Sequence, residues 1–219
     1  MRHDIELRLE LPEDYAAVEN VTREAFWNKH VPGCNEHFLA HVLRSSAAFL
    51  PELDFVALHD GKIIGNIMYT KAVIRCDDGS ERAVLSFGPV SVMPLMQGQG
   101  VGSMLIRHSL ERAKELGHGA VLIYGDPGYY SRFGFGSAEQ YGIGTPDDFF
   151  ADALQAIELI PGTLSNCAGL FIEDAIYEVD DAEAAAFDKN FLPKALRDDL
   201  PSQHRFLELV KARKPRKNG

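Results

Sequence analysis

The chain has 219 residues, of which 46% are hydrophobic, so it can bury a sizeable core and does not have the composition of a disordered protein. Its formal net charge of −10 argues against nucleic acid as the main partner, because phosphate binding needs a basic surface, and it is compatible with a cationic substrate. The three cysteines lie far apart and lack Cys-x-x-Cys spacing, which argues against a disulfide scaffold and against a zinc site.

No segment of the sequence is as long and apolar as a membrane span, and the N-terminus lacks the apolar stretch of a signal peptide. These features predict a cytoplasmic protein with no membrane partner. The last residues include a basic run from Lys211 to Lys217. Short charged ends of this kind are usually solvated, so we expect a mobile tail there rather than a nucleic-acid contact.

The first half of the chain predicts two amphipathic helices and a run of antiparallel strands. Asp60-Gly61 is a two-residue hairpin signal, and Asp77 to Ser80 forms a second turn signal. A loop is expected at 28–35. The predicted elements are a strand at 5–9, helices at 12–26 and 37–46, and strands at 54–58, 63–74 and 83–92.

The second half predicts a crossover from strand through helix to strand. Residues 101–116 have helical spacing of apolar positions, and the short apolar strand 120–124 follows. A right-handed crossover makes this strand parallel to the one at 83–92. Asp126 is a natural N-cap for a short helix that ends at Gly134.

A glycine-rich turn precedes the helix at 101–116. Gly98, Gly100 and Gly102 leave successive backbone N–H groups uncovered at a helix N-terminus, which favours anion binding. The third glycine of a dinucleotide fingerprint would stand at position 103, which is Ser103, and no Gly-Lys-Ser/Thr follows as a Walker A loop requires. The turn is therefore a phosphate cradle of another kind.

Two motifs resemble the GNAT N-acetyltransferase superfamily, in particular bacterial members with a C-terminal extension. Gln97-x-x-Gly100-x-Gly102 resembles the superfamily's Gln/Arg-x-x-Gly-x-Gly/Ala signature, and it lies as the signature does between an apolar strand and a helix. Tyr130-x-x-x-Gly134-Phe135 resembles a second family segment and follows the next strand. Two motifs in the right order are more specific than either alone.

The resemblance implies an α/β GNAT fold, with a mixed, mostly antiparallel central sheet flanked by helices. Residues 3–145 would form the acetyltransferase core, and residues 146–219 would complete the sheet and the acceptor side, with strands near 156–160 and 170–172. Acetyl-CoA would be the co-substrate, with no metal ion. Its expected binding residues are Val90, Ser91, Val92, Gln97, Gly98, Gln99, Gly100, Val101, Gly102 and Ser103, with the Val90 amide polarising the thioester carbonyl.

The family's mechanism implies direct transfer of the acetyl group to an amine in a ternary complex, with Tyr130 as the acid that protonates the departing thiolate. Tyr129 is the adjacent alternative. The acceptor would be a small-molecule or peptide amine, and a homodimer is compatible with this function. The rival hypothesis is a non-catalytic acyl-CoA-binding or sensor module, which would keep the turn but need no acid.

Some parts of the family pattern are missing or ambiguous. Relatives often carry Asn and Ala where this chain has Ile123 and Asp126, so the usual asparagine contact to the cofactor is in doubt. No cysteine lies near either motif to form an acyl-enzyme. The proton acceptor for the amine stays open among five residues, which are Glu24, His30, Glu36, Glu173 and Asp174.

Overall fold

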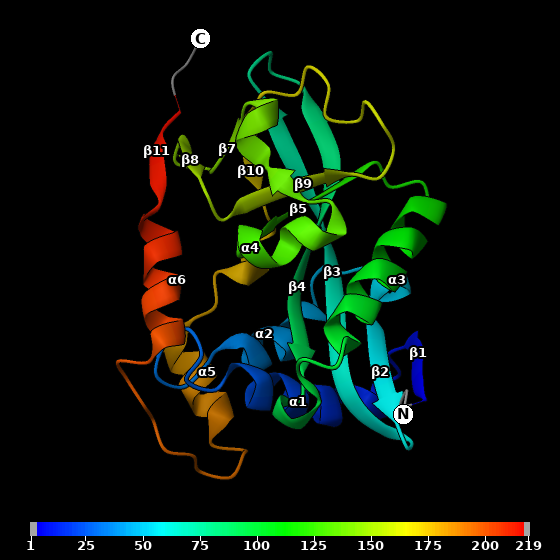
Figure 1. Cartoon of the computed structure of the whole chain (residues 1–219), viewed down its shortest axis with the longest axis vertical. Coiled ribbons are helices and arrows are strands. Elements are labelled where there is room, and N and C mark those ends of the chain that lie inside the picture. Colours follow the sequence, from blue (N-terminus) through cyan, green and yellow to red (C-terminus); the bar gives the residue numbers. More distant parts are fainter. Residues whose placement is uncertain (1–3, 217–219) are drawn as a thin grey trace. The chain divides into compact units, whose positions relative to one another are not determined.

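A computed structural model describes residues 4–216, so His3, the first residue of the predicted core, and Lys217 of the basic run lie outside the described residues. The chain divides into two compact units that interleave along the sequence. The first unit comprises Met1–Tyr69, Gly88–Ser109 and Ala175–His204, and the second comprises Thr70–Phe87, Leu110–Asp174 and Arg205–Gly219. The long strands β3 (Lys62–Cys76) and β4 (Glu81–Val92) have residues in both units (Figure 1).

The first unit contains the N-terminal strands and most of the helices. Its further elements are β1 (Ile5–Leu9), α1 (Tyr15–Phe26), α2 (Glu36–Leu43), β2 (Phe55–His59), the first nine residues of α3 (Val101–Glu115), and α5 (Asp181–Asp188). The strand order β1-β2-β3-β4 leaves β4 at the edge of this unit's sheet. Val18 of α1 packs on Val56 and Leu58 of β2, and α2 packs on Met68 of β3 through Ala40 and Leu43.

The second unit is built around the other halves of β3 and β4. Its further elements are β5 (Ala120–Tyr124), α4 (Pro127–Tyr130), β6 (Gly136–Ser137), β7 (Ile143–Gly144), β8 (Phe149–Ala151), β9 (Leu154–Glu158), β10 (Gly169–Ile172), β11 (Arg213–Pro215) and most of α6 (Pro201–Lys211). The predicted parallel pairing of β4 with β5 is confirmed by the register Leu85–Val121. A core that includes Ile74, Leu122 and Phe171 lies at the centre of the unit.

The segment beyond residue 145 supplies strands to this sheet. β9 pairs antiparallel with β5 over five positions, and β10 pairs antiparallel with β3 from Gly169–Cys76 to Ile172–Val73. The sheet is therefore mixed and mostly antiparallel, which confirms the predicted fold class.

The prediction of a mobile tail is wrong for the residues that the structure describes. β11 pairs with β8 at the end of the chain, shown in red in Figure 1. Its cations are held by carboxylates of the same unit, since Arg213 pairs with Asp147, and Lys214 Nζ lies 2.7 Å from Glu139. Arg216 is 8% exposed and pairs with Asp77 and Asp148. The strongly acidic composition thus offers the basic run partners within its own chain.

A buried charge cluster lies beneath α2 in the first unit. Arg44 binds Glu10 with a shortest distance of 2.7 Å, and both side chains are almost fully buried. The Asp54 carboxyl beside them is 3% exposed, and its Oδ1 has no hydrogen-bond partner among the described residues. Burial raises the pKa of Asp54 to about 10, and the hydrogen bond to Glu10 and the charge of Glu10 act in the same direction. Asp54 is therefore protonated at neutral pH.

This protonation costs stability in a definite pH range. The unfolded chain releases the Asp54 proton above about pH 4, whereas the folded chain holds it to about pH 10, so the contribution to the free energy of unfolding falls as pH rises between these limits. Asparagine can keep the hydrogen bond to Glu10 without this cost. We expect Asp54→Asn to raise the free energy of unfolding by about 1–3 kcal/mol at pH 8 and far less at pH 4.5.

Urea denaturation at the two pH values measures this difference. The matched control is Asp152→Asn in an exposed turn, which should have little effect at either pH. A destabilised Asp54→Asn protein at pH 8 would show that the buried carboxyl is ionised and needed as such.

Candidate active site

The predicted phosphate cradle lies in the first unit, between β4 and α3. Gly98 and Gly100 have positive φ angles of 74° and 90°, and both lie exposed. The first hydrogen bond of the helix runs from the Met104 amide to the Gly100 carbonyl at 3.0 Å. The amides of Val101, Gly102 and Ser103 precede this bond, so they are the N-terminal donors that a helix leaves unused, and the helix dipole favours an anion in front of them.

The two glutamines of the turn stabilise its backbone. Gln97 Nε2 donates to the Val92 carbonyl at 2.9 Å, and Gln99 Nε2 donates to the Leu95 carbonyl at 2.8 Å. These side chains tie the turn back to the residues that leave β4. They hold the shape of the loop. The Gln97 amide donates to the Pro94 carbonyl at 3.3 Å, so the amides that remain for a ligand are those at the start of α3.

The end of β4 has the form of an edge strand with one buried side chain. Ser91 is 1% exposed, and its hydroxyl donates to Thr22 Oγ1 at 3.1 Å, which in turn donates to Asn66. Val90 and Val92 are partly exposed on either side of it. The pairing of β4 with β5 lies at Leu85–Val121, before these residues, so the backbone edge of Val90, Ser91 and Val92 away from β3 can pair with an extended, amide-bearing ligand.

Tyr130 belongs to the second unit, where Asp126 caps the start of α4 by accepting from the Gly128 amide at 2.9 Å. The ring of Tyr130 lies against Gly125, at which an added Cβ would come within 2.2 Å of the ring, so only glycine permits this packing. Phe87 of β4 and Phe135 surround the ring, at centroid distances of 5.9 and 5.7 Å. Burial raises the pKa of Tyr130, so the phenol keeps its proton at neutral pH.

Tyr129 has different surroundings, although it is the next residue. The guanidinium of Arg132 lies 4.7 Å from the centroid of its ring. Ile123, which stands where relatives often have asparagine, is buried in β5 with 1% exposure. The structure therefore distinguishes Tyr130, in an apolar pocket against β4, from Tyr129, which stacks on a cation.

A cysteine, a histidine and an aspartate meet elsewhere in the first unit. Cys34 Sγ lies 3.5 Å from His37 Nδ1, and His37 Nε2 lies 3.1 Å from Asp188 Oδ1 without hydrogen-bond geometry. Burial raises the pKa of Cys34 to about 12 and lowers the pKa of His37. A protonated thiol is a poor nucleophile, so this cluster anchors the loop at 28–35 to α5 rather than forming a covalent site.

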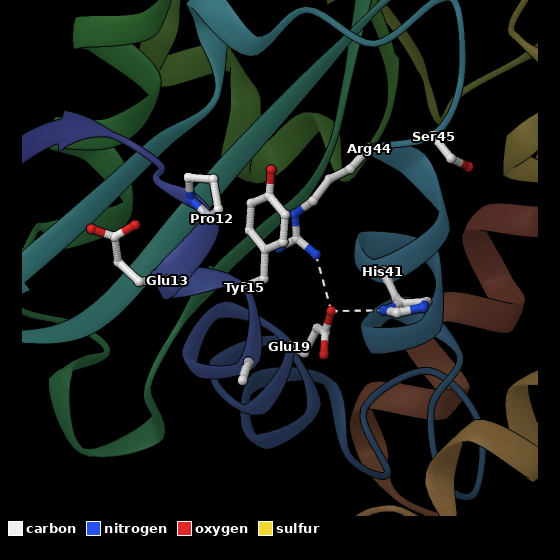
Figure 2. A pocket seen from close by; sticks show the side chains of 8 residues that line it. Pro12, Glu13, Tyr15, Glu19, His41, Arg44 and Ser45 are labelled. Atoms are coloured by element: carbon white, nitrogen blue, oxygen red, sulfur yellow. Dashed lines mark hydrogen bonds and ion pairs between the residues drawn. The ribbon is translucent and has the colours of Figure 1, made fainter.

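A shallow cavity of about 560 Å³ also opens in the first unit, between the start of α1 and the end of α2 (Figure 2). Its polar groups bind one another. Glu19 lies 2.9 Å from His41 and 3.0 Å from Arg44, and Arg44 stacks on Tyr15 at 4.0 Å from the ring centroid. This network pairs the charged groups of Glu19, His41 and Arg44 with one another, and no residue of the two motifs lines the cavity.

The structure separates the five candidate proton acceptors. Glu24 pairs with Lys194 at 2.9 Å, and His30 pairs with Glu36 at 3.0 Å, all in the first unit. Glu173 and Asp174 lie in the second unit, where Ser86 Oγ donates to Glu173 Oε1 at 2.6 Å. Ser86 was not a candidate in the sequence, because nothing local connects residues 87 positions apart.

Residues 9–138 match the model of the acetyltransferase (GNAT) domain family, which is more than half of the chain. The chain belongs to the GNAT family. The resemblance seen in the two motifs is therefore confirmed, and the chain is an acyltransferase of the GNAT type. This assignment favours an enzyme over the rival hypothesis of a non-catalytic acyl-CoA-binding or sensor module.

Individual relatives agree with the family assignment. The chain is 29% identical over 165 residues to the uncharacterized N-acetyltransferase YhbS of Escherichia coli K12, which covers 75% of this chain and 93% of YhbS. The structure of E. coli YhbS in complex with CoA matches with a TM-score of 0.70 at 26% identity, over 81% of this chain and 93% of that one. A GNAT family acetyltransferase from Brucella melitensis in complex with acetyl-CoA matches with a TM-score of 0.64 at 29% identity, over 80% and 99%.

Within residues 4–216, no cluster of three His, Cys, Asp or Glu side chains is placed to hold a metal ion. No helix in the same range is long and apolar enough to cross a bilayer.

Proposed function

We propose that this chain transfers the acetyl group of acetyl-CoA to a primary amine, by direct attack of the amine on the thioester in a ternary complex. The observation that carries the proposal is the exposed glycine turn, whose amides at Val101, Gly102 and Ser103 open α3 directly after the edge strand β4. A pyrophosphate needs convergent donors of this kind. The similar structures from E. coli and B. melitensis, which contain CoA and acetyl-CoA, support the same ligand.

The cofactor would bind to the ten residues predicted from the sequence. In this proposal, the turn from Gln97 to Ser103 holds the pyrophosphate, chiefly through the amides of Val101, Gly102 and Ser103. The open edge of β4 at Val90, Ser91 and Val92 pairs with the pantetheine amides. The Val90 amide would donate to the thioester oxygen, where negative charge develops in the transition state.

Tyr130 would protonate the departing CoA thiolate. Its apolar surroundings hold the phenol in the protonated form. The same surroundings also raise the pKa of a thiolate formed there, which offsets the higher pKa of the phenol as a proton donor. The stacking of Tyr129 on Arg132 supports the choice of Tyr130 over its neighbour.

The acceptor is proposed only as a class, a small-molecule or peptide amine. The test follows the release of free CoA thiol from acetyl-CoA with spermidine, kanamycin, lysine or a tetrapeptide with a free N-terminus, and without amine as the control for hydrolysis. We expect at least one amine to accelerate thiol release and to gain 42 Da by mass spectrometry, roughly the mass of one acetyl group in place of one hydrogen. Tight CoA binding with no acceleration by any amine would contradict the proposal.

A further inference from the structure

The side chain of Glu173 lies on one face of the sheet in the second unit and joins two of its strands. Glu173 directly follows the last residue of β10, and β10 and β4 are both neighbours of β3. Its Oε1 accepts a hydrogen bond from Ser86 Oγ of β4 at 2.6 Å. The carboxyl therefore reaches from β10 across β3 to the strand that continues toward the cofactor-binding residues.

Two aromatic residues lie on the same face of the sheet as this carboxyl. Phe171 lies two residues before Glu173 and so projects to the same face of β10. Its ring packs on Tyr124 at the end of β5, with 6.0 Å between centroids. Burial raises the pKa of Tyr124, and the charge of Glu173 acts on the hydroxyl in the same direction. We call Glu173, Ser86, Tyr124 and Phe171 the carboxylate face.

Tyr130 lies on the opposite face. Phe87 follows Ser86 in β4, and successive side chains of a strand point to opposite faces of the sheet. The ring of Tyr130 contacts Phe87, whereas Glu173 binds Ser86. The proposed acid and this carboxylate therefore flank β4 from its two faces, at adjacent residues.

The pairing of β4 with β5 ends just before Ser86 and Phe87. The register that joins the two strands is Leu85–Val121, while β5 continues along β9 as far as Tyr124. Ser86 and Phe87 follow Leu85 in β4, so they lie in the part of β4 that no longer pairs with β5. An amine on one face and a thiol leaving on the other would meet there.

We infer that Glu173 accepts the proton of the acceptor's ammonium group on the carboxylate face, and this inference rests on the proposed acetyl transfer. The ammonium gives one proton to Glu173, and the nitrogen lone pair forms the bond to the thioester carbon. The C–S bond then breaks, and the thiolate takes the proton of Tyr130. The second nitrogen proton leaves as the amide forms and restores the phenol through water, and Glu173 returns its proton to solvent.

The environment of Glu173 suits this role. Burial raises the pKa of Glu173, and the hydrogen bond from Ser86 opposes the rise, so the carboxylate is more basic than an exposed one yet is stabilised as an anion. Tyr124 is the titratable group facing it from β5, and Asp147 and Arg213 act in turn on Tyr124. Glu24, His30 and Glu36, in contrast, are paired within the first unit.

The test measures kcat/KM against pH for Glu173→Gln, with the amine that gives the fastest transfer among spermidine, kanamycin, lysine and the tetrapeptide. We expect kcat/KM to fall by about 100-fold or more and the acid limb of the profile that belongs to Glu173 to disappear, while the Kd for CoA stays within about twofold. The matched control is Glu178→Gln, an exposed glutamate of the same segment, which should retain the wild-type profile.

A second variant separates proton transfer from a structural role. Ser86→Ala removes the hydrogen bond to the carboxylate, so it should raise the pKa of Glu173 and move the acid limb to higher pH, with activity recovered at alkaline pH. If the wild-type protein transfers acetyl and Glu173→Gln has the same dependence of kcat/KM on pH, the inference about Glu173 is wrong and the proposed function still stands. If the wild-type protein transfers acetyl to none of the four amines, the proposed function fails and the inference fails with it.

Discussion

Replacing Gly100 by glutamate is expected to abolish CoA binding, with a loss of affinity of roughly 100-fold or more. A carboxylate about 4 Å from a phosphate charge costs on the order of 3–4 kcal/mol near a protein surface, and tenfold in affinity corresponds to about 1.4 kcal/mol. An added Cβ at Gly100 meets nothing within 4 Å, so the new side chain would enter the space in front of the amides rather than the protein core. Isothermal titration calorimetry with CoA measures the effect.

The structure offers a control with the same local backbone. Gly79, in the turn between β3 and β4, has a φ of 85° and is equally open, so Gly79→Glu carries the same left-handed strain and the same added charge. It should destabilise the protein about as much while binding CoA normally. Retained affinity in Gly100→Glu would count against a phosphate cradle at this turn.

Replacing Tyr130 by phenylalanine should slow turnover by at least about tenfold and leave the Kd for CoA near the wild-type value. The ring that packs on Gly125 and Phe87 is kept, so the fold loses only the hydroxyl. Steady-state kinetics with the best amine, together with CoA titration, separates the loss of an acid from a loss of binding.

Tyr129→Phe is the matched control, because it removes the same hydroxyl from the adjacent ring and keeps the stacking on Arg132. Its turnover should stay close to that of the wild-type protein. A larger defect in Tyr129→Phe than in Tyr130→Phe would move the acid to position 129.

Most regular elements could be predicted because their signals are local. The strands 5–9 and 120–124 and the start of the helix at 101 were predicted at their observed bounds, and the Asp60-Gly61 turn joins β2 to β3 as expected. Alternation, hairpin turns and glycine stops lie within a few residues of the elements they define. The family motifs are local in the same way, which is why the glycine turn and Tyr130 could be named from the sequence.

Features that depend on distant partners could not be predicted. The ion pairs of Arg216 with Asp77 and Asp148 join residues 139 and 68 positions apart, and they turn an expected free tail into a folded strand. Asp54 and Glu173 look like ordinary acidic residues in the sequence, and only burial beside Glu10 or contact with Ser86 distinguishes them. The boundary between residues 145 and 146, and the ten cofactor-binding residues, stay predictions.

The interleaving of the units has a consequence for synthesis on the ribosome. β3 and β5 are made before residue 125, but the strands that pair with them, β10 and β9, follow between residues 154 and 172, and β11 completes the smaller sheet at residues 213–215. A nascent chain that ends before β9 exposes the free edge of β5, and such edges pair readily with other chains. The second unit can therefore close only after β9, β10 and β11 have emerged, which places its folding later than that of the strands made first.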